Sequence, residues 1–297
     1  MTIIPAILDK WIRSRLDPPF KEEILARIGE IERSLSQLTR VVAPTATPPS
    51  NSLTVRELVA NRYLMGSGIE IGAFASPLKV PSSALVTYVD NCTASEALTS
   101  LTVCGLTHKD FGVEEAGLVV PDIVDDGQFL RSVGDSTQDF VIANHVLEHY
   151  EDPLSGFKNI LRVTKHGGTV YLALPDMRRC FDRVRVPTPI EHVLRDYEEG
   201  PKWSRAQAFR EFGEVFVTEG MDKGLFPKLN GHEREQFIEE VISELEAAGF
   251  SIHFHAWTPD SMIEMFLTAK RHLKLNFEFE IVQQNGDEVL FVFRKSQ

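Results

Sequence analysis

The segment "GIEIGAFASP", residues 68–77, decides how the chain is interpreted. It reads as a short apolar strand that carries Glu70, followed by Gly72 and a turn. A buried strand that ends at a glycine turn is typical of the first strand of a nucleotide-binding α/β domain. Phe74 and Ser76 stand where such loops have further glycines. The segment is therefore either a modified cofactor loop or a tight bend in an ordinary α/β domain.

Composition excludes several classes of protein. The chain has 297 residues and a net charge of −12, so we expect one large or two small domains that repel nucleic-acid phosphates. The nearest basic stretch is "RRCFDRVR" at 178–185. Cys92, Cys104 and Cys180 form no CxxC pair, which argues against a zinc knuckle or a disulfide framework. No apolar run approaches the ~20 residues of a membrane span, and we expect a cytoplasmic protein without a transmembrane segment.

The N-terminal part is predicted to be an extension. Within residues 21–40, apolar side chains recur at spacings of four and three, which predicts a helix. That helix either pairs two subunits as a homodimer or packs on its own domain. Residues 43–52 are rich in Pro, Ser and Thr and are typical of a linker. We therefore divide the chain into a helical extension (1–42), a linker (43–52) and a main domain (53–297).

Strands and helices alternate in the main domain. Short, nearly continuous apolar runs predict five strands buried on both faces of a mostly parallel, Rossmann-like α/β sheet, at 68–73, 85–91, 118–126, from 138, and at 167–175. The fourth, "QDFVIANHVLEH", starts as a strand and is expected to turn into a helix. A further helix starts near Asp152-Pro153 and stops at Gly167-Gly168, which are typical start and stop signals.

The pattern changes after the fifth strand. Residues 176–231 are polar and aromatic and predict a helical, substrate-capping insert outside the sheet. A helix resumes at "HEREQFIEEVISELEAAGF", and "SIHFHAW" at 251–257 resembles a strand. Thr258 and Pro259 predict the start of another helix. The chain closes with an antiparallel hairpin, for which Asn285-Gly286 predicts a type I′ turn.

Acidic residues follow the first three predicted strands. In an open parallel sheet, ligands bind beyond the carboxyl ends of the strands. Asp90, after the second strand, is placed to accept both ribose hydroxyls, and an acid after the third strand can reach an adenine amino group. Any one of these acids could be a solvated strand end, but the ordered set favours an adenosine-containing cofactor.

The motifs "IEIG", "YVDN", "DFVIANHVLEHYEDP" and "ILRVTKHGGTVYLALP", with the terminal hairpin, resemble class I S-adenosylmethionine-dependent methyltransferases. The resemblance covers roughly residues 53–175 and the C-terminal part. It implies a seven-stranded sheet whose last strand is antiparallel to its neighbours. "LPDMRRCFDRVRVPTPIEHVLRD" further resembles a bacterial subset that is often found beside glycosyltransferases.

The resemblance also implies a cofactor site. Its residues are the first-motif Glu70, Gly72, Ala73 and Phe74, the ribose-binding Asp90, the adenine-binding Asp125 or Asp126, and Asn144 and His145 beside the methionine portion. The chain departs from the family at Phe74 and Ser76, where glycines are usual. Phe74 either stacks on the ligand or packs in the core. It would crowd a pyrophosphate, so an NAD-dependent oxidoreductase is the less favoured alternative.

Two histidines are the candidate catalytic residues. His145 and His149 lie four apart on the predicted helix, with Glu148 beside them. His145 is the first candidate for a general base, and His149 could instead be structural. Some ubiquinone-type methyltransferases place a divalent ion at the corresponding segment. No further ligand is evident in this sequence, so we assign no metal.

The insert supplies the candidate acceptor-binding residues: Asp176, Arg179, Arg183, His192 and Tyr197. Its arginines could bind an acceptor carboxylate or phosphate, or they could form a surface salt-bridge network. The predicted strand at 251–257 carries His253, His255 and Trp257 at alternate positions, and the sequence assigns them no role. We expect a methyltransferase that acts on a small-molecule or glycan acceptor, on oxygen rather than carbon or nitrogen. The alternative is a non-catalytic module that interacts through its N-terminal helix.

Overall fold

The computed structural model describes residues 53–100, 114–222 and 228–297. The predicted N-terminal extension, its possible dimerisation helix at 21–40 and the linker lie outside the described residues. Among the described helices, none combines the length and the apolar character that a membrane span needs.

The sheet confirms the predicted fold class. Its seven strands follow the order β3-β2-β1-β4-β5-β7-β6. β1 to β5 pair in parallel, whereas β7 is antiparallel to both β5 and β6. The strands are β1 (Gly66–Ile71), β2 (Ala84–Asp90), β3 (Ile123–Val124), β4 (Gln138–Asn144), β5 (Thr164–Pro175), β6 (Phe277–Asn285) and β7 (Glu288–Lys295).

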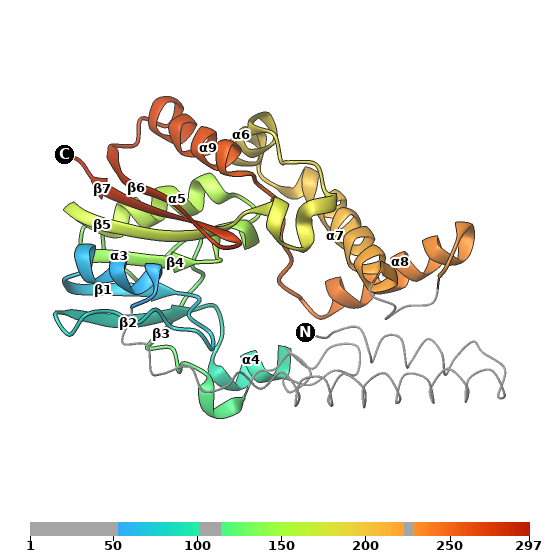
Figure 1. Ribbon diagram of the computed structural model, residues 1–297, viewed down its shortest axis with the longest axis horizontal. Helices are drawn as coiled ribbons and strands as arrows, with labels where there is room; N and C mark the ends of the chain where they lie inside the picture. The colour runs from blue at the N-terminus through green and yellow to red at the C-terminus, as the bar shows by residue number, and fades with distance from the viewer. Residues whose placement is uncertain (1–52, 101–113, 223–227) are drawn as a thin grey trace.

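Helices cover both faces of the sheet (Figure 1). On one face, Phe157 and Phe266 pack against Phe277 and Phe293 of the hairpin. On the other face, a second apolar cluster joins the first helix to Phe140. The described helices are α3 (Val55–Tyr63), α4 (Ala94–Ser100), α5 (Pro153–Val163), α6 (Ile190–Glu199), α7 (Lys202–Asp222), α8 (Gly231–Ala247) and α9 (Pro259–His272). Thr258 caps α9 and Pro259 begins it, as predicted.

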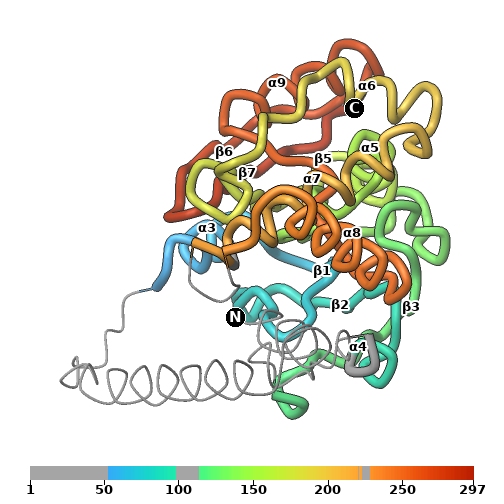
Figure 2. Tube along the Cα trace, turned by 90° about the vertical axis from the view of Figure 1, so that its right-hand side faces the viewer, coloured from blue at the N-terminus to red at the C-terminus, as the bar shows by residue number. Residues whose placement is uncertain are grey.

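Helices α7 and α8 form a cap with a core of its own. Phe209 of α7 and Ile238 and Val241 of α8 belong to an apolar cluster separate from the two clusters on the sheet. Figure 2 views the molecule from the carboxyl edge of the parallel strands, and α7 and α8 lie in front of the sheet. Because α8 supplies four of the ten buried residues of this core, the cap extends beyond the insert predicted at 176–231.

Two predicted strands are corrected. The third strand contains only Ile123 and Val124, because Pro121 has no N–H to donate and a 3₁₀ turn, η1 (Glu115–Gly117), precedes it. Residues 251–256 form no strand, since the N–H groups of Phe254 and His255 bond to the Glu148 carbonyl instead of a neighbouring strand. At the end of this segment, Trp257 forms an isolated bridge with Asp176.

The predicted helix through the two candidate histidines is also wrong. His145 has a φ of 54°, which an α-helix cannot contain, and only the short 3₁₀ turn η2 (Leu147–His149) follows. The chain must turn sharply here, because Asp152 already caps α5. The two histidines are therefore not neighbours on one helical face.

The hairpin exists, but its turn is shifted by one residue. Asn285 pairs with Glu288, so the central residues are Gly286 and Asp287 rather than Asn285 and Gly286. Gly286 has a φ of 62°, and Asp287 is not among the residues with positive φ. A type I′ turn needs positive φ at both central positions, so this turn is not type I′.

Candidate functional site

The candidate site lies at the carboxyl edge of the parallel strands. β1 lies between β2 and β4, and the connections leave it in opposite directions, which makes this point the topological switch point of the sheet. Ile71 pairs with both Val89 and Ala143, so the residues that follow these three strands lie side by side. Antiparallel β7 begins at the same edge, because Glu288 pairs with Pro175.

Glu70 holds the first loop in place. Its side chain is buried, and its carboxylate accepts the backbone N–H of Leu78 at 2.9 Å (Oε1) and 3.2 Å (Oε2). Burial raises the pKa of Glu70 to about 7, against the opposing effect of the Leu78 hydrogen bond. The loop turns tightly at its start, where Gly72 has a φ of 64° and the Ser76 N–H donates to the Ala73 carbonyl at 2.8 Å.

Phe74 adopts a conformation that favours glycine. Its φ is 47°, in the left-handed region that bulky residues rarely occupy. Its carbonyl accepts the N–H of Val119 at 2.7 Å, which ties the loop to the segment before β3. The loop therefore keeps a glycine-like turn although its sequence has lost the glycine. The side chain of Phe74 is half-buried.

The acids at the ends of β2 and β3 each accept one backbone N–H. Asp90 Oδ1 accepts the N–H of Asn91 at 2.8 Å, and no other donor from the described chain reaches this carboxylate. Burial raises the pKa of Asp90. Asp125 Oδ2 accepts the N–H of Ser132 at 2.6 Å, and Asp126 Oδ1 accepts the N–H of Gln128 at 2.9 Å. Each of the three carboxylates thus keeps acceptor capacity for a ligand.

Asn144 lies on the other side of the switch point, at the end of β4. Both polar atoms of its amide are buried and have no hydrogen-bond partner among the described residues. An unpaired buried amide is costly, so its persistence points to a ligand. An adenosine-containing cofactor with an amino-acid tail fits this set, because Asp90 offers acceptors for hydroxyls and Asn144 offers a donor and an acceptor for polar atoms of the tail.

His145 is held between two carboxylates. Its Nε2 lies 2.8 Å from Glu288 Oε2, and its Nδ1 lies 3.5 Å from Glu148 Oε1. Burial lowers its pKa, but the contacts with Glu148 and Glu288 outweigh burial and raise the pKa to about 9. The ring therefore carries a proton at neutral pH and offers no lone pair, which is the opposite of what a general base needs.

His149 is in a different state. Its Nδ1 lies 3.0 Å from the Ile252 carbonyl and 3.0 Å from Ser251 Oγ. A carbonyl can only accept, so Nδ1 carries the hydrogen and Nε2 keeps its lone pair. Burial lowers the pKa of His149. Of the two predicted catalytic histidines, His149 is the one with a free lone pair.

The predicted acceptor-binding residues are already engaged in contacts within the protein. Each of them has a protein partner: Asp176 binds Arg178, Arg179 donates to the Gly286 carbonyl, Arg183 binds Glu219, His192 lies 3.1 Å from Asp196, and Tyr197 lies 3.1 Å from Lys158 Nζ. Much of the polar insert is therefore an internal ion-pair network, which is the alternative that the sequence left open.

Glu288 and its partner Arg56 escaped the sequence analysis. Glu288 binds Arg56 of α3, with Nε–Oε1 at 2.7 Å, in addition to His145. Asp182 and Asp196, two polar residues of the insert, are buried and bind His253 and His255 respectively. One feature of the sequence could have indicated Glu288. It directly follows the hairpin turn, and an antiparallel strand that starts there begins at the edge where the parallel strands end.

Comparison with known proteins identifies the chemistry. Residues 66–172 match the family model described as a methyltransferase domain. These residues form a methyltransferase domain, whose methyl donor is S-adenosylmethionine. The matched residues run from β1 into β5 and contain the switch point, Asp90 and Asn144. No curated protein matches the chain.

Solved structures resemble this methyltransferase only distantly. One is a Thermotoga maritima S-adenosylmethionine-dependent methyltransferase, described as a possible histamine N-methyltransferase (14% identity, 78% of this chain and 83% of that chain, TM-score 0.39). Another is from Aquifex aeolicus (12% identity, 80% and 85%, TM-score 0.34). A Rhodobacter sphaeroides protein described as a zinc-dependent alcohol dehydrogenase is equally distant (15%, 80% and 88%, TM-score 0.43). These likenesses do not bear on the substrate.

Proposed function

We propose that this methyltransferase methylates a hydroxyl oxygen of a small-molecule or glycan acceptor at the carboxyl edge of the sheet. The observation that supports the site is a pair of polar groups on either side of β1. The Asp90 carboxylate accepts a single N–H, and the amide of Asn144 has no partner among the described residues. The α7–α8 cap lies in front of this edge (Figure 2), and we propose that it contributes to acceptor binding.

The proposed cofactor contacts follow the strand ends. Asp90 accepts the ribose hydroxyls, Asp125 or Asp126 binds the adenine amino group, and Asn144 binds the methionine portion. Glu70 acts indirectly, because it anchors the loop through Leu78 and so fixes the positions of Gly72, Ala73 and Phe74. S-adenosylmethionine supplies a methyl group that is already activated on a positively charged sulfur, so the protein contributes mainly alignment.

A hydroxyl acceptor also needs a group to take its proton, and His149 fits this role better than His145. The free lone pair on His149 Nε2 is placed to accept a proton, while the carbonyl of Ile252 fixes the tautomer. The charged ring of His145 is instead suited to orienting the methionine portion of the cofactor or to interacting with it electrostatically. We propose Asp176, Arg179, Arg183, His192 and Tyr197 as the surroundings of the acceptor.

Isothermal calorimetry with S-adenosylmethionine and S-adenosylhomocysteine tests the cofactor site. Asp90→Asn removes the charged acceptor and should weaken binding of both ligands by at least about tenfold, since hydrogen bonds to charged groups contribute about 1.5–3 kcal/mol. Asp139→Asn is the matched control, because Asp139 binds Lys165 and the Ser67 N–H at the opposite edge. Equal binding by parent and Asp90→Asn would contradict the proposed site. Binding of neither ligand by the parent would favour the non-catalytic module.

The acceptor can be identified with an isotopically labelled methyl donor. Nucleotide sugars, lipid-linked glycans and quinone precursors are offered separately, and the labelled product is examined by NMR. A new methyl signal attached to oxygen is expected. Methyl transfer only to nitrogen or carbon would overturn the oxygen assignment while leaving the cofactor site intact.

A further inference from the structure

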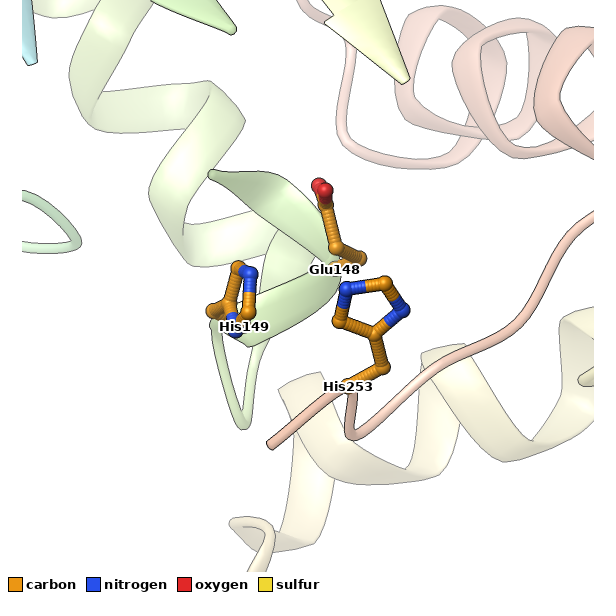
Figure 3. Close-up of side chains that lie close together, drawn as sticks. All are labelled: Glu148, His149 and His253. Carbon is orange, nitrogen blue, oxygen red and sulfur yellow. The ribbon is translucent and has the colours of Figure 1, made fainter. Parts of the chain in front are cut away.

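Three potential metal ligands come together beside the cofactor edge. A carboxylate oxygen of Glu148 and one ring nitrogen each of His149 and His253 lie within 4.8 Å of one another. Figure 3 shows that Glu148 and His149 come from the η2 turn and His253 from a facing segment more than a hundred residues later. No spacing in the sequence connects these two segments.

Glu148 is the unusual member of this group. Its side chain is fully buried, and neither carboxylate oxygen has a hydrogen-bond partner within the described chain. His145 Nδ1 lies 3.5 Å from Oε1, which is too long for a good hydrogen bond, and Oε2 has no hydrogen-bond partner among the described residues. A buried carboxylate without hydrogen bonds is strongly unfavourable unless a cation completes it.

The two imidazoles are already oriented as metal ligands are. Nδ1 of His149 faces the Ile252 carbonyl at 3.0 Å, and Nδ1 of His253 lies 2.6 Å from Asp182 Oδ2. These acceptors fix the hydrogens on Nδ1 and leave the Nε2 lone pairs for a ligand. A carboxylate or carbonyl behind each histidine is the usual outer shell of protein metal sites.

The backbone around the cluster is fixed by further contacts. The N–H of Phe254 donates to the Glu148 carbonyl at 2.8 Å, which clamps the two segments together. Arg185 donates to Asp182 Oδ1 at 3.0 Å and to the His253 carbonyl at 2.9 Å. The three ligands are thus placed by contacts that exist without an ion.

We propose that Glu148, His149 and His253 bind one divalent transition-metal ion of the zinc class. Two imidazole nitrogens and one carboxylate oxygen suit zinc better than magnesium or calcium. Tetrahedral bonds of ~2.1 Å place ligand atoms ~3.4 Å apart, so the side chains must close by roughly an ångström or more. Three protein ligands leave a fourth position for water or an acceptor oxygen.

This site goes beyond the proposed function and changes one role within it. With the ion present, His149 Nε2 is a ligand rather than a base, and lowering the pKa of a bound hydroxyl falls to the metal. Cofactor binding through Asp90 does not depend on the ion, so the two proposals can fail separately.

A second group, His192, Asp196 and His255, does not carry the same inference. Asp196 Oδ2 binds both histidines, at 3.1 and 3.0 Å, and Oδ1 accepts the hydroxyl of Ser204 at 2.8 Å. Its carboxylate is therefore satisfied by the protein. It provides a control for metal binding at a similar set of side chains.

Measuring the metal content of the protein tests the proposal directly. The full chain is stripped with a chelator, loaded with Zn²⁺, desalted and examined by elemental analysis; Co²⁺ is added separately for its visible absorption. We expect about one Zn²⁺ per chain and a Co²⁺ spectrum of low coordination number. His253→Asn and His149→Asn should each lower the affinity for Zn²⁺ at least about tenfold, because a ligand is lost. Asparagine can still donate near the former Nδ1 position, so the contacts with Asp182 and Ile252 are preserved.

Folding and cofactor binding are checked on the same samples. Circular dichroism shows whether each variant folds, and Glu148→Gln, a neutral isostere, provides a third ligand variant. His192→Asn should keep the parental affinity for Zn²⁺. The proposal is overturned if the folded parent takes up no stoichiometric Zn²⁺, if folded His253→Asn binds Zn²⁺ as the parent does, or if His192→Asn alone loses it. Binding of S-adenosylhomocysteine by the stripped parent shows that the cofactor site survives any of these results.

Discussion

Glu70 makes the stability of the protein depend on pH. Burial raises its pKa from 4.5 to about 7, so between these values the folded state holds a proton that the unfolded chain releases. The free energy of unfolding should therefore fall as pH rises from about 4.5 to 7. Glu70→Gln cannot ionise and can still accept the Leu78 N–H. We expect it to be more stable than the parent at pH 8 by about 1–3 kcal/mol, at about 1.4 kcal/mol per pKa unit.

Denaturant unfolding at pH 5 and pH 8 measures this difference. Glu246→Gln on the exposed surface of α8 removes the same charge and should shift stability equally little at both values. If Glu70→Gln and the parent lose the same stability between pH 5 and pH 8, the carboxyl of Glu70 does not carry this pH dependence.

At the same scale, the sequence predicted where the candidate cofactor residues lie, but not the protonation state of the residues beside them. Asp90 and Glu70 could be placed from strand order alone, because the carboxyl ends of parallel strands meet at one edge. The state of His145 could not be predicted, since it depends on Glu288, which is 143 residues away. At Phe74 the residue type suggested a changed loop, but the backbone keeps the glycine-like turn.

Among the elements, β1 contains a residue that the packing of the sheet requires to be glycine. A Cβ on Gly68 would lie 2.3 Å from the Phe140 carbonyl oxygen of β4, far inside contact distance. Gly286 in the hairpin turn has a φ of 62° but open space around it. We expect Gly68→Ala to cost at least about 3 kcal/mol through overpacking and Gly286→Ala about 1–2 kcal/mol through backbone strain alone.

The two substitutions are compared by urea unfolding. Both add one methyl group, so a difference between them reports the surroundings of each glycine. Equal losses of stability, or a larger loss for Gly286→Ala, would show that β1 and β4 can separate enough to admit a methyl group.

Elements buried on both faces were the easiest to predict from sequence. β1, β4 and β5 have continuous apolar runs, and α9 carries its own start signals at Thr258 and Pro259. Residues 251–256 were misjudged because alternating aromatic and polar residues imitate a strand. The N–H groups of Phe254 and His255 donate to the Glu148 carbonyl on a distant turn, and the local sequence cannot predict that contact.

In the whole molecule, the apolar clusters of the sheet and the apolar cluster of the α7–α8 cap meet near the carboxyl edge. The sheet is stabilised by clusters on its two faces, while α7 and α8 share a separate cluster. Arg185 connects the cap to the segments at the edge, because it donates to Glu211 of α7 as well as to Asp182 and the His253 carbonyl. The proposed metal ligands lie on the same connection, since His253 follows the cap and Glu148 follows β4. An ion there would fasten the cap to the sheet.

Separate cores predict separate responses to cavities. Phe157 of α5 contacts Phe266, Phe277 and Phe293, so Phe157→Ala should destabilise the whole sheet domain by about 3–5 kcal/mol. Ile238→Ala in α8 creates a cavity only within the cap. Regions with their own core can open without global unfolding, so hydrogen exchange should accelerate in α7 and α8 of Ile238→Ala while β4 and β5 keep the parental rates. Phe157→Ala should accelerate exchange throughout. Equal acceleration of β4 and β5 in both variants would mean that cap and sheet unfold as one cooperative unit.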